Sequence, residues 1–289
     1  MTRSCAMIKA EVFDTRTCEL GEGAFWHPSQ NRFYWFDILG DRLLSRDGDR
    51  AVEWAMNEHC SAAGWIDDST LLIASETGLW RFDTANGSRD LITPLEADDP
   101  TTRSNDGRAD PHGGFWIGTM GKGAETGRGA IYRFYLGTLR KVVSGITIPN
   151  SICFTPDGRA AYFTDTTVGQ IMYQPLDNAG WPTGAARVFL DLGARGIHPD
   201  GSVVDAEGAL WNAQWGLGRV VRYLPDGTKD MIVTVGGAHS SCPAFGGPNL
   251  QTLFVTTACE GIENPDMAQG RVYTARVPIK GRTEPRVIL

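Results

Sequence analysis

Hydrophobic residues along this chain occur in short runs, and each run is bounded by Gly, Pro, Asn or Asp. The runs are rich in Val, Ile, Tyr, Phe and Trp, which is typical of β-strands, and no stretch shows apolar residues at helical spacing. The runs recur in a fixed order: an Asp/Asn-Gly turn, a run, small polar residues, a glycine and a second alternating run. Six copies of this unit cover residues 25–44, 64–82, 107–134, 152–173, 203–223 and 244–275.

A unit that recurs at roughly forty residues predicts a β-propeller with four-stranded blades. A single blade cannot bury both faces, whereas a ring of blades buries them together. A β-sandwich also contains Gly-rich hairpins, but its strands do not repeat in a shared order. We therefore predict an all-β, six-bladed propeller with antiparallel blades around a central channel, formed as one domain over residues 1–289. Residues 7–13 and 285–289 both resemble strands, and we expect them to complete the same last blade.

Composition narrows the class of protein. The chain is 42% hydrophobic and 21% charged, as in soluble globular proteins, and its net charge of −7 comes without a long charged run. This argues against a nucleic-acid partner and allows an acidic site that holds a cation. The first twenty residues are too charged for a signal peptide or a membrane span, so we predict a cytoplasmic protein, monomeric or weakly homo-oligomeric. Its 6 scattered cysteines contain no C-x-x-C, and we expect reduced, mostly buried thiols.

Polar residues stand just before the first strand of several units. In a propeller this strand lines the axis and starts near one rim of the channel, so equivalent positions converge in space. Glu22, Asn105, Asn150 and Asp200 fall at matching offsets in four units. Their oxygens suit Ca²⁺, Mg²⁺, Mn²⁺ or another divalent ion. The alternative is that each caps a turn; it is weaker for Glu22, because Leu-Gly-Glu-Gly is not a usual turn sequence.

Several motifs together resemble the SMP-30/gluconolactonase/regucalcin family of six-bladed propeller lactonases. They are Leu20–Trp26, Arg103–Gly107, Gly118–Met120, Ile148–Ser151, and Pro199–Gly201 with Trp211. The resemblance implies that Glu22, Asn150 and Asp200 hold one divalent cation (Ca, Zn, Mn, Mg or Fe). It also implies that Arg103 and Asn105 contact sugar hydroxyls.

Two local sequences bear on the substrate. Gly121-Lys122-Gly123 stands where the animal regucalcins carry acidic residues, which affects the substrate and not the metal site. The stretch Trp211–Trp215 looks more like the bacterial sugar-lactonase relatives, and Trp215 falls where it can reach the pocket.

These residues predict a metal-dependent hydrolase that opens a sugar (aldono-) lactone, a pentonolactone or hexonolactone, to the aldonic acid. The cation would polarise the lactone carbonyl, and Asp200 would activate water. No G-x-S-x-G sequence supports a serine nucleophile. Alternatives are an esterase or phosphotriesterase with a less polar substrate, and a non-catalytic binding scaffold; the Arg103/Asn105 pair favours a polyol. Whether Lys122 or His198 contacts the substrate is open, and His27, His112 and His239 are expected in turns or at the surface.

Overall fold

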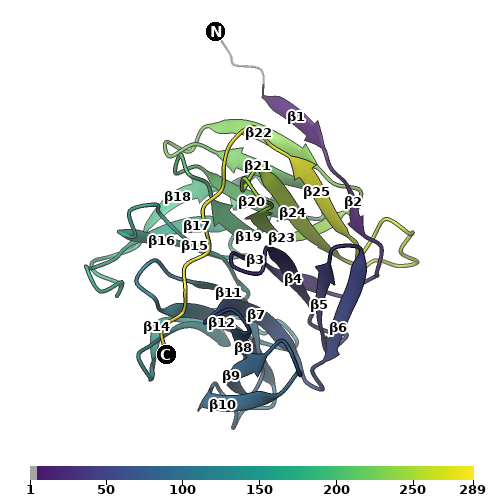
Figure 1. Cartoon of the computed structure of the whole chain (residues 1–289). Coiled ribbons are helices and arrows are strands. Elements are labelled where there is room, and N and C mark those ends of the chain that lie inside the picture. Colours follow the sequence, from purple (N-terminus) through teal and green to yellow (C-terminus); the bar gives the residue numbers. More distant parts are fainter. Residues whose placement is uncertain (1–4) are drawn as a thin grey trace.

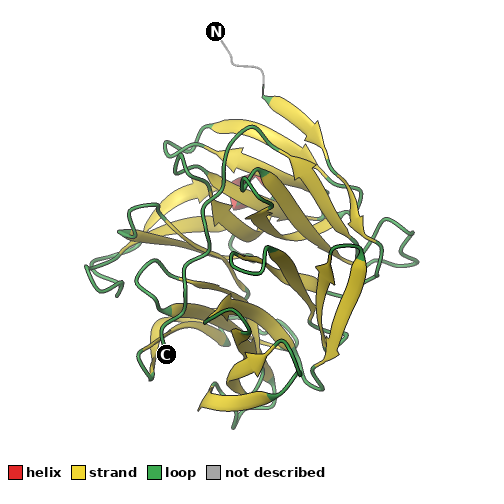
Figure 2. Ribbon diagram, viewed as in Figure 1, coloured by secondary structure: helices red, strands yellow, loops and turns green. Residues whose placement is uncertain are grey.

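Six β-sheets form a closed ring in the computed structural model, which describes residues 5–289 (Figures 1 and 2). The only helical element in that range is a 3₁₀ turn, η1 (Gly193–Arg195). Hairpins turn at Asp-Gly pairs such as Asp157-Gly158, where the glycine has a φ of 68° that favours a residue without a Cβ. The predicted six-bladed β-propeller is confirmed.

The blades are numbered in chain order, and within each blade the strands are given from the innermost to the outermost. Blades 1 to 3 comprise β3 (Gly21–His27), β4 (Arg32–Asp37), β5 (Arg42–Asp47) and β6 (Arg50–Ala55); β7 (Cys60–Trp65), β8 (Thr70–Ser75), β9 (Gly78–Asp83) and β10 (Arg89–Pro94); and β11 (Thr102–Ala109), β12 (Phe115–Gly121), β13 (Gly129–Tyr135) and β14 (Thr138–Ile146). Blades 4 to 6 comprise β15 (Pro149–Phe154), β16 (Ala160–Asp165), β17 (Gln170–Pro175) and β18 (Arg187–Asp191); β19 (His198–Val204), β20 (Leu210–Trp215), β21 (Arg219–Tyr223) and β22 (Lys229–Thr234); and β23 (His239–Gly246), β24 (Thr252–Ala258) and β25 (Val272–Arg276).

The innermost strands β3, β7, β11, β15, β19 and β23 contact one another around the axis. Every one of them shifts register against its second strand near its N-terminal end. Such a β-bulge adds an unpaired residue and bends the strand locally. The inner strands therefore bend near one and the same rim of the channel.

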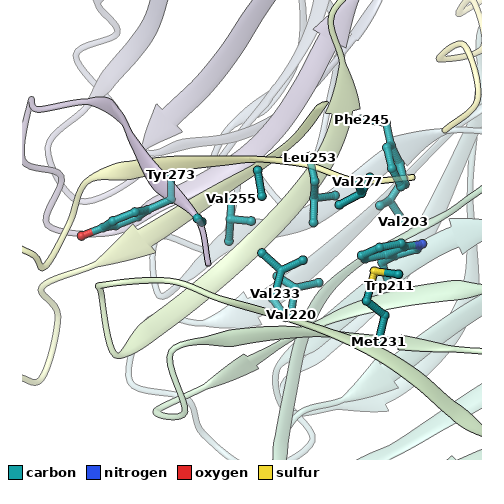
Figure 3. Packing of buried hydrophobic residues seen from close by; sticks show 13 residues of the cluster. Val203, Trp211, Val220, Met231, Val233, Phe245, Leu253, Val255, Tyr273 and Val277 are labelled. Atoms are coloured by element: carbon teal, nitrogen blue, oxygen red, sulfur yellow. The ribbon is translucent and has the colours of Figure 1, made fainter. Parts of the chain in front are cut away.

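Apolar side chains pack mainly between blades. Within the described range, six clusters of buried hydrophobic residues each join two neighbouring blades. Figure 3 shows the cluster between blades 5 and 6, where Trp211 of β20 meets Phe245 of β23 edge to face at 5.5 Å. Burying one large apolar side chain contributes about 1.5–3 kcal/mol. Blade-to-blade packing is thus a main source of stability for the ring.

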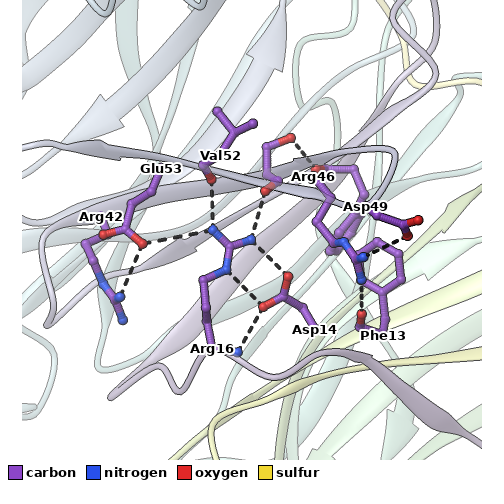
Figure 4. A network of polar contacts seen from close by, with 10 residues as sticks. Phe13, Asp14, Arg16, Arg42, Arg46, Asp49, Val52 and Glu53 are labelled. Carbon is purple, nitrogen blue, oxygen red and sulfur yellow. Dashed lines mark hydrogen bonds and ion pairs between the residues drawn. The ribbon is translucent and has the colours of Figure 1, made fainter.

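Two strands from the N-terminus close the ring. β2 (Glu11–Asp14) pairs antiparallel with β25 and completes blade 6, while β1 (Ala6–Lys9) pairs parallel with β22 as a fifth strand of blade 5. Arg16 then ties this segment to blade 1: its guanidinium donates to Asp14, to the carbonyl oxygen of Val52 at 2.9 Å and to that of Ser45 at 2.8 Å (Figure 4).

The C-terminal segment does not join the last blade. Residues 285–289 form no strand and run along blades 2 and 3, where the N–H of Val287 donates to the carbonyl oxygen of Trp65 at 2.9 Å. Val287 is 1% exposed within the cluster between those blades. The prediction that both terminal segments complete the same blade is therefore wrong: only residues 11–14 do, because β2 fills the one free outer edge of blade 6.

The six cysteines carry free thiols, and all except the half-buried Cys5 are buried, as expected. Among residues 5–289, the structure contains no helix with the length and apolar character that crossing a bilayer requires.

Candidate functional site

A cavity of about 510 Å³ opens at the rim where the inner strands bend. All five residues singled out from the sequence line it, namely Glu22, Arg103, Asn105, Asn150 and Asp200. The structure therefore brings residues from blades 1, 3, 4 and 5 to one place. Their convergence at one end of the channel is as predicted.

Their positions within the strands differ from the expectation. The residues lie inside the inner strands and not ahead of them, because each strand begins before its bulge. Glu22 and Asn150 are the last paired residues before the bulge, opposite Phe36 and Thr164, whereas Asn105 and Asp200 are unpaired within it. The offsets therefore differ by one residue between blades.

The two carboxamides are held in fixed orientations. Asn105 Nδ2 donates to the carbonyl oxygen of Pro149 at 2.9 Å and to Asn150 Oδ1 at 3.2 Å. Arg103 Nη1 donates to Asn105 Oδ1 at 2.8 Å. Asn150 Nδ2 donates to Thr166 Oγ1 at 2.9 Å. The hydroxyl of Thr166 donates its own hydrogen to the carbonyl oxygen of Pro199 at 2.8 Å, so it accepts from Asn150 Nδ2, and Asn150 Oδ1 points toward Asn105.

The two carboxylates are buried and poorly partnered. Glu22 accepts one hydrogen bond, from the N–H of Gly23 at 3.1 Å, and Asp200 Oδ1 is buried without a partner among the described residues. Burial raises the pKa of Glu22 to about 8, and the charge of the neighbouring Asp106 adds to the rise. Burial also raises the pKa of Asp200 well above its usual range, followed by the charge of Glu22. Two carboxylates that repel each other in a desolvated site favour a bound cation or a shared proton.

Arg103 supplies the positive charge of the cavity. It is 6% exposed, and burial lowers its pKa although the nearby charges of Glu260, Glu22 and Asp200 raise it. Its Nη1 is engaged by Asn105 and by the carbonyl oxygen of Ser104, whereas Nε and Nη2 have no acceptor among residues 5–289. The guanidinium therefore keeps N–H groups for a ligand.

The five cavity residues fall within a region that this chain shares with a known protein family. The family model described as SMP-30/Gluconolactonase/LRE-like region matches residues 20–259, which contain all five of them. This chain belongs to that family. The resemblance predicted from the sequence motifs is thereby confirmed.

Three relatives match almost the whole chain. A calcium-binding protein, regucalcin, from Agrobacterium tumefaciens str. C58 has a crystal structure with a TM-score of 0.96 and 42% identity, covering 99% of this chain and 100% of that one. A protein of Rhizobium meliloti (strain 1021) with the provisional name sugar lactone lactonase is 40% identical, covering 92% of this chain and 93% of its own. L-arabinolactonase of Azospirillum brasilense is 38% identical, covering 94% and 93%.

In this member of the SMP-30/gluconolactonase/LRE-like family, further cavity residues lie at or just beyond the end of second strands. They are Met120 of β12 and Lys122 just after it, Thr166 and Thr167 after β16, Trp215 of β20 and Glu260 after β24. The second strand runs antiparallel to the inner one, so its end meets the same rim. The sequence search compared only positions before inner strands and therefore missed Thr166, Thr167 and Glu260.

Lys122 and the histidines named in the sequence analysis occupy different kinds of position. Lys122 and His198 both line the cavity, and Lys122 forms an ion pair with Glu76 of blade 2. His27 is fully buried, with Nε2 at 3.0 Å from the carbonyl oxygen of Asp67, so its expected place in a turn or at the surface is wrong. Its ring lies near the aromatic rings of Phe25 on β3, Tyr34 on β4 and Trp65 on β7. His239 is half-buried and stacks on Trp215.

Proposed function

We propose that this protein is a divalent-cation-dependent sugar lactonase that opens an aldonolactone to the aldonic acid. The observation that carries the proposal is the pairing, in one cavity, of two buried and poorly partnered carboxylates with an Arg103–Asn105 fork. Names of relatives support it: an L-arabinolactonase and a calcium-binding regucalcin each match more than nine-tenths of the chain.

The chain's own oxygens fit a divalent cation. Among residues 5–289 no group of three or more His, Cys, Asp or Glu side chains is placed to hold a metal ion. The candidate ligands are therefore the carboxylates of Glu22 and Asp200 with the carboxamide oxygen of Asn150, a set of hard donors suited to Ca²⁺, Mg²⁺ or Mn²⁺. The buried Asp200 Oδ1, which has no protein partner, supports this fit. When bound, such a cation supplies Lewis-acid polarisation of a carbonyl and stabilisation of an oxyanion.

The protein groups have separate roles in this proposal. Arg103 donates hydrogen bonds to substrate oxygens, and Asn105 Oδ1 accepts one from a substrate hydroxyl, because both N–H groups of Asn105 already have acceptors. Together they hold the lactone in one orientation. Asp200, whose side chain lines the cavity, accepts a proton from the attacking water. Asn212 Nδ2 donates to the carbonyl oxygen of Asp200 at 3.2 Å and Ser151 Oγ donates to the same oxygen at 2.5 Å, which fixes the backbone that carries this base.

The test is hydrolysis of a panel of five- and six-membered aldonolactones, with and without a chelator. We expect turnover that the chelator abolishes and that an added divalent cation restores. Aryl esters and phosphotriesters form the comparison panel. Faster turnover of these than of any lactone would contradict the sugar-lactonase proposal, and no turnover of any ester at any metal condition would favour a binding scaffold.

A further inference from the structure

Glu260 lines the cavity as a third acidic residue beside Glu22 and Asp200. It follows β24, and its backbone is fixed on both sides: its N–H donates to the carbonyl oxygen of Glu19 at 2.9 Å, and its carbonyl oxygen accepts from His239 Nδ1 at 2.9 Å. Its carboxylate forms no hydrogen bond or ion pair with any side chain in the described range. A held backbone with an unengaged carboxylate in a cavity is the arrangement of a ligand-contacting residue.

Arg103 and Glu260 line the same cavity, and no ion pair joins them among the described residues. Of the carboxylates that raise the pKa of Arg103, Glu260 has the largest effect. Arg103 keeps Nε and Nη2 free, and its side chain is almost fully buried. A hydroxyl group donates one hydrogen bond and accepts up to two, so it binds well where a donor and an acceptor lie close together. The gap between a guanidinium and a carboxylate offers both.

Trp215 forms an adjoining wall of the cavity. Its ring stacks on that of His239, with centroids 4.2 Å apart and an interplanar angle of 21°. Because His239 is itself fixed by its bond to the Glu260 backbone, the indole is held from behind and presents an apolar surface to the cavity. Aromatic faces pack well against the C–H side of a flat polyol ring, and here the platform adjoins the polar gap.

We propose that Glu260, Arg103 and Trp215 form a hydroxyl-recognition subsite that selects a polyhydroxylated ring. Glu260 accepts a hydrogen bond from a substrate hydroxyl to which Arg103 donates, and Trp215 packs against the C–H face of the same ring. The inference rests on the proposed lactonase function and specifies its substrate class. It assigns to Glu260 and Trp215 the rejection of lactones that lack hydroxyl groups.

The test combines binding with turnover. Binding of a 1,4-anhydropentitol, which has the ring and hydroxyls of a pentono-1,4-lactone but no ester, is measured by calorimetry beside that of its deoxy analogues. Hydrolysis is measured on the matching pentonolactone and its deoxy forms. The variants are Glu260→Gln, Trp215→Ala and Trp215→Phe. The controls are Glu263→Gln, an exposed glutamate on the same loop, and Trp54→Phe on β6 outside the cavity.

We expect Glu260→Gln to weaken binding of the anhydropentitol about 10- to 100-fold, the range for losing a hydrogen bond to a charged group. The same variant should raise KM for the hydroxylated lactone more than it changes kcat, and should lose discrimination against one deoxy form. Trp215→Ala should weaken binding about tenfold and Trp215→Phe much less, because a phenyl ring retains most of the apolar face. The two controls should behave as the wild type.

The experiment distinguishes failure of the subsite proposal from failure of the lactonase proposal. Unchanged binding and KM in Glu260→Gln and Trp215→Ala, with active wild-type enzyme, would overturn the subsite and leave the lactonase proposal standing. Wild-type protein that binds the anhydropentitol and loses that binding in Glu260→Gln, but hydrolyses no lactone, would support the subsite and overturn the lactonase proposal. Wild-type protein that neither binds the analogue nor hydrolyses lactones would overturn both.

Discussion

Two aspartates of blade 5, Asp200 and Asp205, are both buried but have opposite surroundings. Asp205 accepts four hydrogen bonds: Oδ1 from the N–H groups of Glu207 and Ala209, and Oδ2 from Trp211 Nε1 and Arg222 Nε, the last two at 2.8 Å. Asp200, at the other end of β19, has one oxygen without any partner. An unsatisfied buried polar group costs about 1–3 kcal/mol, and more when it is charged.

Blade 3 contains a second buried aspartate with a full set of partners. Asp110 accepts from the N–H groups of His112 and Gly114 through Oδ1, and from Trp116 Nε1 and Arg133 Nε through Oδ2. It thus has the same four kinds of donor as Asp205, and both residues follow an inner strand. At the end of the channel away from the cavity, Asp110 and Asp205 have all their hydrogen-bond partners within the protein. At the cavity end, the carboxylates of Glu22 and Asp200 have few or none. Burial alone does not distinguish a structural carboxylate from a functional one; the number of its partners does.

The largest expected effect is on activity. Asp200→Asn should lower lactone turnover by about 10³-fold or more, because it removes both a general base and a candidate cation ligand. The melting temperature in chelator should not fall, since the variant relieves a buried charge that lacks partners. Steady-state kinetics and calorimetry check the two effects. Substantial remaining activity would remove Asp200 from the mechanism.

The second effect is on stability. Asp205→Asn should lower the free energy of unfolding by about 3 kcal/mol, the scale for breaking a buried ion pair from one side, because Arg222 and Trp211 lose their acceptor. Denaturant unfolding measures this change. Activity per folded molecule should stay close to that of the wild type. A variant as stable as the wild type would show that the four hydrogen bonds are not what distinguishes Asp205 from Asp200.

The third effect is stabilisation by a cation, which should depend on the cavity carboxylate Glu22 and not on Asp205. At a concentration about a hundred times its dissociation constant, a divalent ion that binds only the folded state adds about 2.7 kcal/mol, which raises the melting temperature. Glu22→Gln should reduce this rise, whereas Asp205→Asn should retain it on its lower baseline. An equal rise in Glu22→Gln and the wild type would place the cation elsewhere.

The fourth effect concerns pH. In chelator, the pKa of Glu22 is raised from 4.5 to about 8 in the folded protein, so the folded state holds a proton that the unfolded chain releases. The contribution of Glu22 to the free energy of unfolding should therefore fall as pH rises from about 4.5 to about 8. Melting curves across this window should show a shallower decline in Glu22→Gln. Identical pH profiles would mean that Glu22 is not desolvated as the structure has it.

Sequence reasoning reached the ring and most of the site because both rest on local signals. Asp-Gly turns and alternating runs are short-range, so six copies predict six blades. Residues such as Asp200 stand out against that repeat. The bulge that places Asp200 inside β19 depends on pairing with β20, and this pairing is invisible in the isolated strand.

Other features depend on distant partners. The path of the C-terminal segment follows from contacts such as that of Val287 with Trp65, which no local pattern indicates. Glu260 lies beyond a second strand, so a search restricted to the starts of inner strands passes over it. The residues that follow second strands include Thr166, Thr167 and Glu260, so comparing those positions between units would have found all three.

Closure of the ring by β2 also sets an order for biosynthesis. β2 is synthesised before every blade strand from β3 onward, whereas its partner β25 is the last strand of the ring to be made. Blade 6 therefore cannot be completed, nor Arg16 be held between blades 6 and 1, until β25 has been synthesised. A nascent chain with five blades still has the exposed faces of blades 1 and 5, so the growing protein depends on rapid completion, or on protection of these faces, to avoid pairing with other chains.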